Sequence, residues 1–179
     1  MRITLILLSF FTSIVSAQMP DFDATESSAK QGNATSQYYL GTMYYIGQGA
    51  PKNDLEAAKW FRLAAEQGLA NAQHNLGVMY DNGEGVPEND LKAVEWFRLA
   101  AQQGVVDSQL NLGVMYQRGD GVPENYLVAY VWYSVSAAQG DENAKIGLEM
   151  VKSLLSKEQI AQGQTLALKC FDSNFKDCP

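Results

Sequence analysis

A 36-residue internal repeat constrains the fold of this sequence more than any other feature. The stretch LGVMYDNGEGVPENDLKAVEWFRLAAQQG at residues 76–104 recurs in closely similar form at residues 40–68 and at residues 112–140. A unit of this size cannot bury its apolar residues alone, whereas copies that stack side by side bury one another. We therefore predict three stacked repeats, at residues 33–68, 69–104 and 105–140.

Each repeat contains two sets of apolar residues at helical spacing. In the second repeat, the first set is Ala72, Leu76, Met79 and Tyr80. The second set is Ala93, Trp96, Phe97, Ala100 and Ala101. Each repeat is therefore predicted to be a pair of amphipathic helices. The tryptophan of each second helix is predicted to lie in the core, and loss of Trp96, in the central repeat, is expected to cost the most stability.

Glycine, proline and asparagine recur between these helices. Because glycine tolerates the left-handed backbone that ends a helix, the first helices are predicted to end at Gly47, Gly83 and Gly119. Side-chain oxygens can accept from the free N–H groups of a first turn, so the second helices are predicted to be capped by Asn53, Asn89 and Asn125. By the same argument the first helices are predicted to be capped by Thr35, Asn71, Asp107 and, in a fourth unit, Asn143.

A further glycine lies inside each first helix, at Gly41, Gly77 and Gly113. Glycine in a helix interior costs about 0.5–1 kcal/mol relative to alanine. Its recurrence predicts that another helix packs closely against this position, and the tryptophan of the second helix is the expected contact.

Residues 1–17 have the pattern of a secretory signal peptide. Arg2 precedes an apolar run from Ile3 to Val15, and small residues precede a predicted cleavage after Ala17. An uncleaved membrane anchor is the alternative, but the run is short because a membrane span needs about 20 residues. Export, to the periplasm or the exterior, is therefore predicted. Residues 18–32 are predicted to form an N-terminal half-repeat that caps the array.

Residues 141–179 are predicted to form a degenerate repeat and a C-terminal cap. A helix is expected at residues 143–155, and Ser156 with Gln159 predicts a capping box at the start of the next helix. The only two cysteines are Cys170 and Cys178, and an even number at short spacing in an exported protein predicts a structural disulfide. A redox or metal role is the alternative, but C-x-x-C spacing and a nearby histidine are both lacking.

The combination of L-G-x-M-Y, G-x-G-V-P-x-N-D and A-x-x-W-F-R-x-A-A-x-Q-G resembles the Sel1-like repeat family, a relative of the tetratricopeptide repeat. The resemblance covers residues 33–140, and the third copy departs from it at Tyr126, Tyr133 and Ser136. It implies an all-α fold, a right-handed α-solenoid of stacked helix-turn-helix repeats with a concave binding surface. It also implies an adaptor or scaffold role, which is frequent among exported bacterial proteins.

Few sequence features point to an enzyme. His74 is the single histidine, which excludes histidine dyads, triads and multi-histidine metal sites, and we expect it to be exposed. Some cysteine-rich members of the resembled family bind or hydrolyse β-lactams, but they carry cysteine pairs within each repeat. An S-x-x-K match runs from Ser27 to Lys30 in the N-terminal half-repeat, without the companion motifs of such enzymes. A non-enzymatic protein without a cofactor is therefore predicted.

A calcium site is a further alternative, at Glu84, Glu88 and Asp90. Acidic residues in loops and at helix starts are more often solvated surface groups that complement the helix dipole. We therefore predict no metal site.

Binding remains as the predicted activity. The net charge of −7 disfavours nucleic acid and anionic membranes, which leaves a protein or peptide partner. If the first helices line the concave side, as the resemblance implies, the variable residues opposite their core face form the binding surface. These residues are Tyr38, Tyr39, Thr42, Tyr45, His74, Asn75, Val78, Asp81, Leu110, Asn111, Val114 and Gln117. Tyrosine suits protein recognition. Packing on the N-terminal cap is the alternative for Tyr38 and Tyr39.

Overall fold

The computed structural model describes residues 21–179, and this part of the chain contains nine α-helices and no strand. The predicted signal peptide lies outside the described residues. In chain order the helices are α1 (Phe22–Lys30), α2 (Ala34–Ile46), α3 (Asp54–Glu66), α4 (Ala70–Asn82), α5 (Asp90–Ala101), α6 (Val106–Arg118), α7 (Tyr126–Ala138), α8 (Glu142–Lys152) and α9 (Lys157–Asp172).

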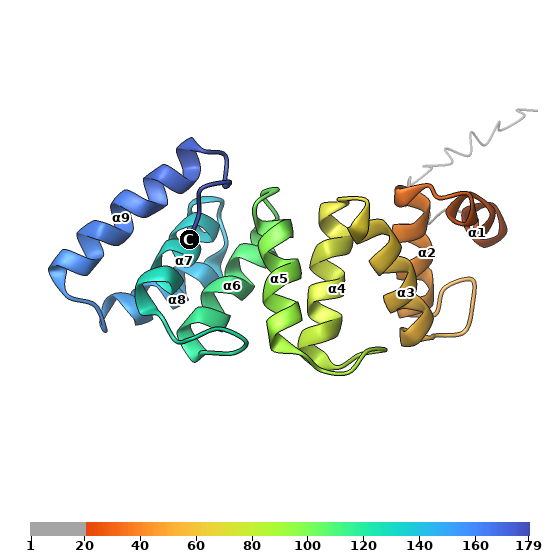
Figure 1. Cartoon of the computed structure of the whole chain (residues 1–179), viewed down its shortest axis with the longest axis horizontal. Helices are drawn as coiled ribbons and strands as arrows, with labels where there is room; N and C mark the ends of the chain where they lie inside the picture. The colour runs from red at the N-terminus through yellow and green to blue at the C-terminus, as the bar shows by residue number, and fades with distance from the viewer. Residues whose placement is uncertain (1–20) are drawn as a thin grey trace, which may run out of the picture.

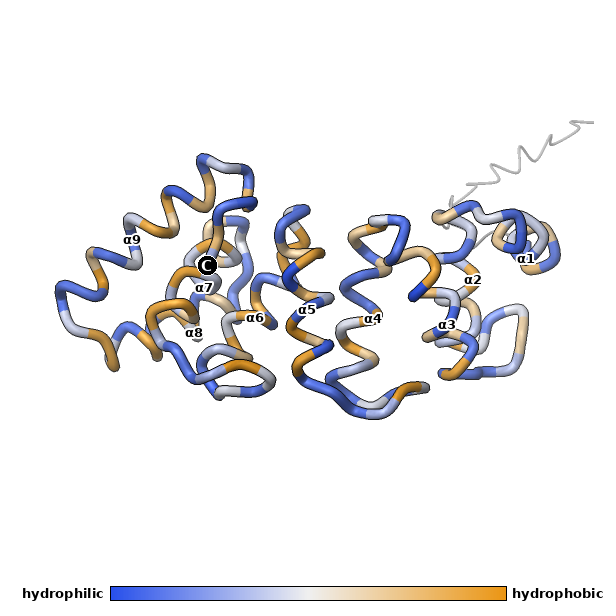
Figure 2. Tube along the Cα trace, in the orientation of Figure 1, coloured by the Kyte–Doolittle hydropathy of each residue, from blue (hydrophilic) through white to orange (hydrophobic). Residues whose placement is uncertain are grey.

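The helices form a row of antiparallel pairs along the long axis of the molecule (Figure 1). Each full repeat contributes one pair, α2–α3, α4–α5 and α6–α7, and each pair packs on the next. Helix α1 packs on α2 at one end, and α8 packs on α7 at the other. Apolar and polar residues alternate along most helices, so that each can turn an apolar face inward (Figure 2). The predicted all-α solenoid is confirmed.

The connections within each repeat are as predicted. Gly83 ends α4 in the left-handed region, with φ 70°, and its N–H donates to the Met79 carbonyl oxygen. Asn89 then caps α5, because its side-chain oxygen accepts from the N–H of Lys92 at 3.0 Å. Gly47 and Gly119 end α2 and α6 in the same way, and Asn53 and Asn125 cap α3 and α7.

The predicted caps of the first helices are wrong. These helices begin two residues earlier than expected, after Asn33, Leu69, Val105 and Asp141, so Thr35, Asn71, Asp107 and Asn143 lie in the first turn. The cause is the end of the preceding helix. Gly68 donates to the Ala65 carbonyl at 2.9 Å and Leu69 donates to the Ala64 carbonyl at 3.1 Å, a Schellman motif. Leu69 therefore closes α3 and opens α4 at once, and its side chain packs on the core.

The glycines inside the first helices do meet an aromatic ring, but of the residue that follows the tryptophan. A Cβ on Gly77 would stand 2.7 Å from the ring of Phe97. The Phe97 ring thus packs directly on the α4 backbone at Gly77, which explains why glycine recurs there. The other pairs are Gly41 with Phe61 and Gly113 with Tyr133.

The three tryptophans differ in burial. Trp132 is 0% exposed and Trp60 is 8% exposed, whereas Trp96 is only partly buried. The expectation that Trp96 is the most costly to lose is therefore wrong on burial, because Trp132 has the most buried surface to lose.

The C-terminal end departs from the repeat. Helix α9 packs mainly on α7 rather than on α8, its predecessor in sequence. Position 149 of α8, the equivalent of Gly113, is an exposed glutamate, so in the described part of the chain no ring packs on α8 there as Tyr133 packs on Gly113. The predicted capping box of Ser156 and Gln159 is present, and the predicted disulfide joins Cys170 and Cys178.

Candidate functional site

Two clefts open between consecutive first helices. The first cleft, about 60 Å³, lies between α2 and α4 and is lined by Tyr45, Phe61, Asn75, Val78 and Met79. The second cleft, about 290 Å³, lies between α6 and α8 and is lined by Leu110, Asn111, Val114, Gln117, Arg118, Tyr133, Asn143, Gly147 and Met150.

The two clefts occupy the same place in the repeat. Adding two periods, 72 residues, to Tyr45, Phe61, Asn75 and Val78 gives Gln117, Tyr133, Gly147 and Met150, which line the second cleft. Each cleft is lined by an aromatic ring that packs on a helix glycine: Phe61 on Gly41 in the first cleft and Tyr133 on Gly113 in the second. The scaffold thus repeats while the lining side chains change.

On one side of the first cleft, the Tyr45 side chain is held by a hydrogen bond. The Tyr45 hydroxyl donates to Glu84 of the next repeat at 2.9 Å, and the Lys52 ammonium lies 5.4 Å from the centre of the Tyr45 ring. The hydrogen bond to Glu84, together with burial, raises the pKa of Tyr45. Tyr45 therefore stays protonated, and its ring is held in one orientation at the mouth of the cleft.

The second cleft is larger and more polar. The Tyr133 hydroxyl donates to the Gln117 side-chain oxygen at 2.6 Å. Burial raises the pKa of Tyr133 to about 12, against the opposing effect of Arg118. The floor is therefore a neutral hydrogen-bonded pair, while Arg118 supplies a positive charge at the rim.

No metal site is formed by these groups. Within residues 21–179, no three His, Cys, Asp or Glu side chains are grouped so that they could hold a metal ion. Glu84, considered above as a calcium ligand, instead accepts the hydrogen bond from Tyr45. Of the helices in this part of the chain, none combines the length and apolarity needed to cross a membrane.

The family of this chain follows from a match to a known repeat model. The Sel1 repeat model matches residues 34–69, 70–105 and 106–141, which together make up more than half of the chain. The chain belongs to the Sel1 repeat family. Sel1 repeats commonly serve as protein-interaction scaffolds, and the fold is mainly non-enzymatic.

Solved structures of other Sel1 repeat proteins are similar. A Sel1 repeat protein from Oxalobacter formigenes has 36% identity and a TM-score of 0.68, over 70% of this chain and 52% of that protein. A protective antigen of uropathogenic Escherichia coli with an SLR fold has 26% identity and a TM-score of 0.67, over 88% of this chain and 42% of the antigen. This chain therefore spans about half or less of the length of these two proteins.

A more distant structure is similar in fold alone. Cysteine-rich protein B of Helicobacter pylori has 22% identity and a TM-score of 0.54, over 68% of this chain and 87% of that protein. A search of curated proteins finds no match.

The structure brings seven of the twelve predicted binding residues of this Sel1 repeat chain into the clefts. Tyr45, Asn75 and Val78 line the first, and Asn111 and Gln117 line the second. Leu110 and Val114, from the same stripe, also line the second.

The other predicted binding residues lie outside the two linings. Tyr39 and Asp81 are exposed, and the Thr42 hydroxyl donates to the Tyr38 carbonyl at 3.0 Å within α2. The Tyr38 ring packs 5.9 Å from that of Phe61 in α3. The aromatic contact with the N-terminal helix α1 is made by a different residue, Tyr44.

The expectation that His74 is exposed is wrong. Its Nδ1 lies 2.8 Å from the Ser108 hydroxyl of α6, and its ring centre lies 5.7 Å from that of Phe97. Burial lowers the pKa of His74, and the charge of Asp107 opposes this shift. His74 is therefore a contact between neighbouring repeats, with its ring nitrogen engaged.

Sequence reasoning missed a ladder of glutamines. Buried Gln73 donates to the Ala65 carbonyl at 3.1 Å and accepts from Gln103 at 2.7 Å. The same two bonds recur at Gln37 with Gln67 and at Gln109 with Gln139. The signal was present, because both glutamines recur at the 36-residue period, and buried polar groups need partners.

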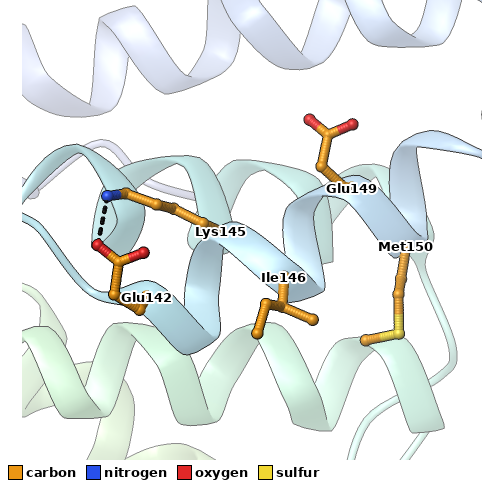
Figure 3. Close-up of a pocket in the computed structure, with 5 residues that line it drawn as sticks. All are labelled: Glu142, Lys145, Ile146, Glu149 and Met150. Carbon is orange, nitrogen blue, oxygen red and sulfur yellow. Dashed lines mark hydrogen bonds and ion pairs between the residues drawn. The ribbon is translucent and has the colours of Figure 1, made fainter.

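A separate depression of about 560 Å³ lies over α8 and is formed by that helix alone (Figure 3). Ile146 and Met150 are 62% and 50% exposed there, and Lys145 pairs with Glu142 at 2.6 Å. A surface with one wall cannot enclose a ligand as the clefts can. The clefts are therefore the better candidate site.

Proposed function

We propose that this chain is an exported scaffold that binds a peptide or protein partner on the face built by the first helices α2, α4, α6 and α8, at the two clefts. The observation that carries this proposal is the recurrence of the cleft two repeats apart, with the same base and different lining residues. A partner that spans both clefts would contact a different set of side chains in each. Its recognition would therefore rest on the residues that differ between repeats.

The lining residues indicate which partner groups fit. The first cleft is small and mostly apolar, with the Asn75 amide as its polar group, and suits a small apolar side chain beside a main-chain amide. The second cleft has room for a larger side chain, and Arg118 favours an acidic or carbonyl-bearing one. Both clefts already carry satisfied internal hydrogen bonds, so binding would require little rearrangement.

The β-lactam alternative finds no support in the described residues. The Lys30 ammonium pairs with Glu26 at 2.9 Å, and the Ser27 hydroxyl accepts only a long bond, 3.5 Å, from Gln31. The S-x-x-K spacing recurs at residues 173–176, where the Ser173 hydroxyl donates to the Cys170 carbonyl at 3.0 Å. A nitrocefin assay tests this alternative, since turnover that is abolished by Ser27→Ala would overturn the scaffold proposal.

Export is part of the proposal and rests on the signal-peptide pattern of residues 1–17. The Cys170–Cys178 disulfide and the bacterial Sel1 repeat neighbours are compatible with it. N-terminal sequencing of the mature protein is the test. A chain that starts at or near Gln18 supports export with cleavage, and a chain that retains Met1 contradicts it.

The binding proposal is tested by placing a charge in each cleft. The wild-type protein is used as bait for the exported fraction of its source cells, and captured proteins are quantified by mass spectrometry. Asn75→Lys and Asn111→Lys are expected to reduce capture of the specific partner at least tenfold, because each places a cation in a cleft lining.

Two exposed asparagines of α4 supply matched controls. Asn71→Lys and Asn82→Lys introduce the same charge on the same helix, outside both linings. They are expected to leave capture unchanged. Equal losses in all four variants would show a non-specific charge effect, and equal retention in all four would place binding elsewhere; either result overturns the proposal.

A further inference from the structure

The end of the chain lies against two second helices, at a site formed by Arg98, Gly104 and Trp132. The Pro179 carbonyl oxygen accepts from the Arg98 guanidinium of α5 at 2.8 Å and from the Trp132 indole N–H of α7 at 3.1 Å. Four residues earlier, the Phe175 ring lies over Gly104, where a Cβ would stand 3.3 Å from it. The segment after α9 thus rests on α5 and α7 through one carbonyl and one aromatic ring.

The segment after α9 has a backbone conformation that is rare for residues other than glycine. Asn174 and Phe175 have φ of 53° and 67°, a region that residues other than glycine rarely adopt. The Cys170–Cys178 disulfide closes the same turn, and Cys178 packs on the core. Trp132, beneath this segment, is 0% exposed.

The same residue types recur one repeat earlier, at Arg62, Gly68 and Trp96, which we call the α3–α5 site. Arg62 and Trp96 are the equivalents, at 36 residues' distance, of Arg98 and Trp132. Arg62 donates to the Tyr80 hydroxyl at 2.8 Å, as Arg98 does to Tyr116. Each guanidinium lies 5.9 Å from the centre of its tyrosine ring, so the two sites share one geometry.

The α3–α5 site has no occupant within residues 21–179. In this part of the chain Arg62 has Tyr80 as its one acceptor, and the Trp96 indole N–H has none. No atom lies within 4 Å of a Cβ built on Gly68, the equivalent of Gly104. Trp96 is only partly buried, whereas its equivalent Trp132 is fully covered.

We propose that the α3–α5 site binds a turn of a partner protein, in which a main-chain carbonyl accepts from Arg62 and Trp96 and an aromatic side chain four residues earlier lies on Gly68. The chain's own C-terminal turn, which ends in residues 175–179, shows that this arrangement of side chains accepts such a turn. Leu63 of α3 and Leu99 of α5, on the same two helices, are 38% and 44% exposed. Because this site lies on the second helices, it is independent of the clefts between the first helices.

The test uses a synthetic peptide of residues 170–179 as the probe, closed by its own disulfide and amidated at its C-terminus, so that Pro179 presents a neutral carbonyl. Trp60, Trp96 and Trp132 are the only tryptophans, so the full chain labelled with ¹⁵N gives one indole N–H signal for each. We expect the Trp96 signal, assigned from its loss in Trp96→Phe, to shift downfield on titration and to saturate. The Trp60 and Trp132 signals are expected to stay in place.

Two substitutions, one in the chain and one in the peptide, distinguish the proposed contacts from non-specific binding. Arg62→Gln is expected to weaken the apparent affinity about tenfold, since one charged hydrogen bond is lost, while an unchanged Trp132 signal confirms that the fold is intact. The peptide carrying Phe175→Ala is expected to bind at least tenfold more weakly to the wild-type chain.

Three results would overturn the proposal. The first is a Trp96 signal that does not move at millimolar peptide. The second is a shift of all three indole signals together, or one that Arg62→Gln leaves unaltered. The third is a Trp96 signal that shifts as the protein concentration is raised in the absence of peptide. That result would mean that a second copy of the chain binds at the α3–α5 site.

Discussion

Gly77 and Phe97 are in contact at the centre of the second repeat: a Cβ added to Gly77 would stand 2.7 Å from two atoms of the Phe97 ring. Real Cβ atoms do not approach other atoms this closely, so the contact is available to glycine alone. Phe97 is 0% exposed and cannot move aside without displacing its neighbours. The unfavourable helix propensity of Gly77 is thus offset by the packing that it permits.

We therefore expect Gly77→Ala to lower the free energy of unfolding, by up to about 2 kcal/mol. Overpacking a core costs about 1–3 kcal/mol, and the better helix propensity of alanine returns about 1 kcal/mol of it. Chemical denaturation of the two proteins measures the difference. In the Phe97→Leu background the same substitution should cost less, because leucine leaves room for the methyl group. An equal cost in both backgrounds would mean that the ring is not the cause.

The positions of the helices and their pairing could be predicted from the sequence, because each recurring residue occupies the same environment in three repeats. Gly41, Gly77 and Gly113 together indicated a close helix contact that one glycine alone could not have indicated. The partner ring was assigned to the tryptophan rather than to the next residue. One residue is 100° around a helix, and only the packed structure decides which of two adjacent aromatic side chains faces inward.

The first-helix caps and the clefts could not be predicted in the same way. Leu69 and Val105 occupy cap positions without any side-chain hydrogen bond, since the Schellman motif of the preceding helix places them there. The clefts are formed across repeats, by side chains such as Tyr45 and Asn75 that belong to different copies. Their depth depends on how neighbouring copies stack, which a pattern within one copy does not contain.

The glutamine ladder leads to a second prediction. Gln109 is 0% exposed, donates to the Ala101 carbonyl at 3.1 Å and accepts from Gln139. Gln109→Ala is expected to lower the free energy of unfolding by about 2–3 kcal/mol, because a buried carbonyl loses its donor and a small cavity forms. Gln139→Ala is the control and should cost about 1 kcal/mol or less, since Gln139 is exposed. Equal costs in urea denaturation would contradict a role for burial.

The tryptophans give a third prediction. Trp132→Ala should lower the free energy of unfolding by about 3–5 kcal/mol, the usual cost of a fully buried aromatic. Trp96→Ala should cost clearly less, because Trp96 keeps part of its surface in water. Thermal denaturation followed by circular dichroism compares the two. If Trp96→Ala were the more damaging, the exposed part of Trp96 would be covered in solution.

His74 gives a prediction about pH, since it is the single histidine of the chain. Burial between α4 and α6 lowers its folded pKa from the ordinary value of 6.5, and Asp107 only opposes this shift. The folded protein therefore binds a proton at His74 less readily than the unfolded chain does. Protonation favours unfolding, so the stabilisation from neutral His74 is fully present above pH 6.5 and is lost as pH falls through the lowered folded pKa.

Comparison with His74→Gln isolates this effect, because the variant lacks only the titrating imidazole. The difference in unfolding free energy, wild type minus variant, should be constant from pH 7 to 8. It should then shrink as pH falls below 6.5 and level off once His74 is protonated in the folded state as well. Urea denaturation at half-unit pH intervals measures it. A difference that grows on acidification would mean that the folded state favours charged His74, with Asp107 outweighing burial.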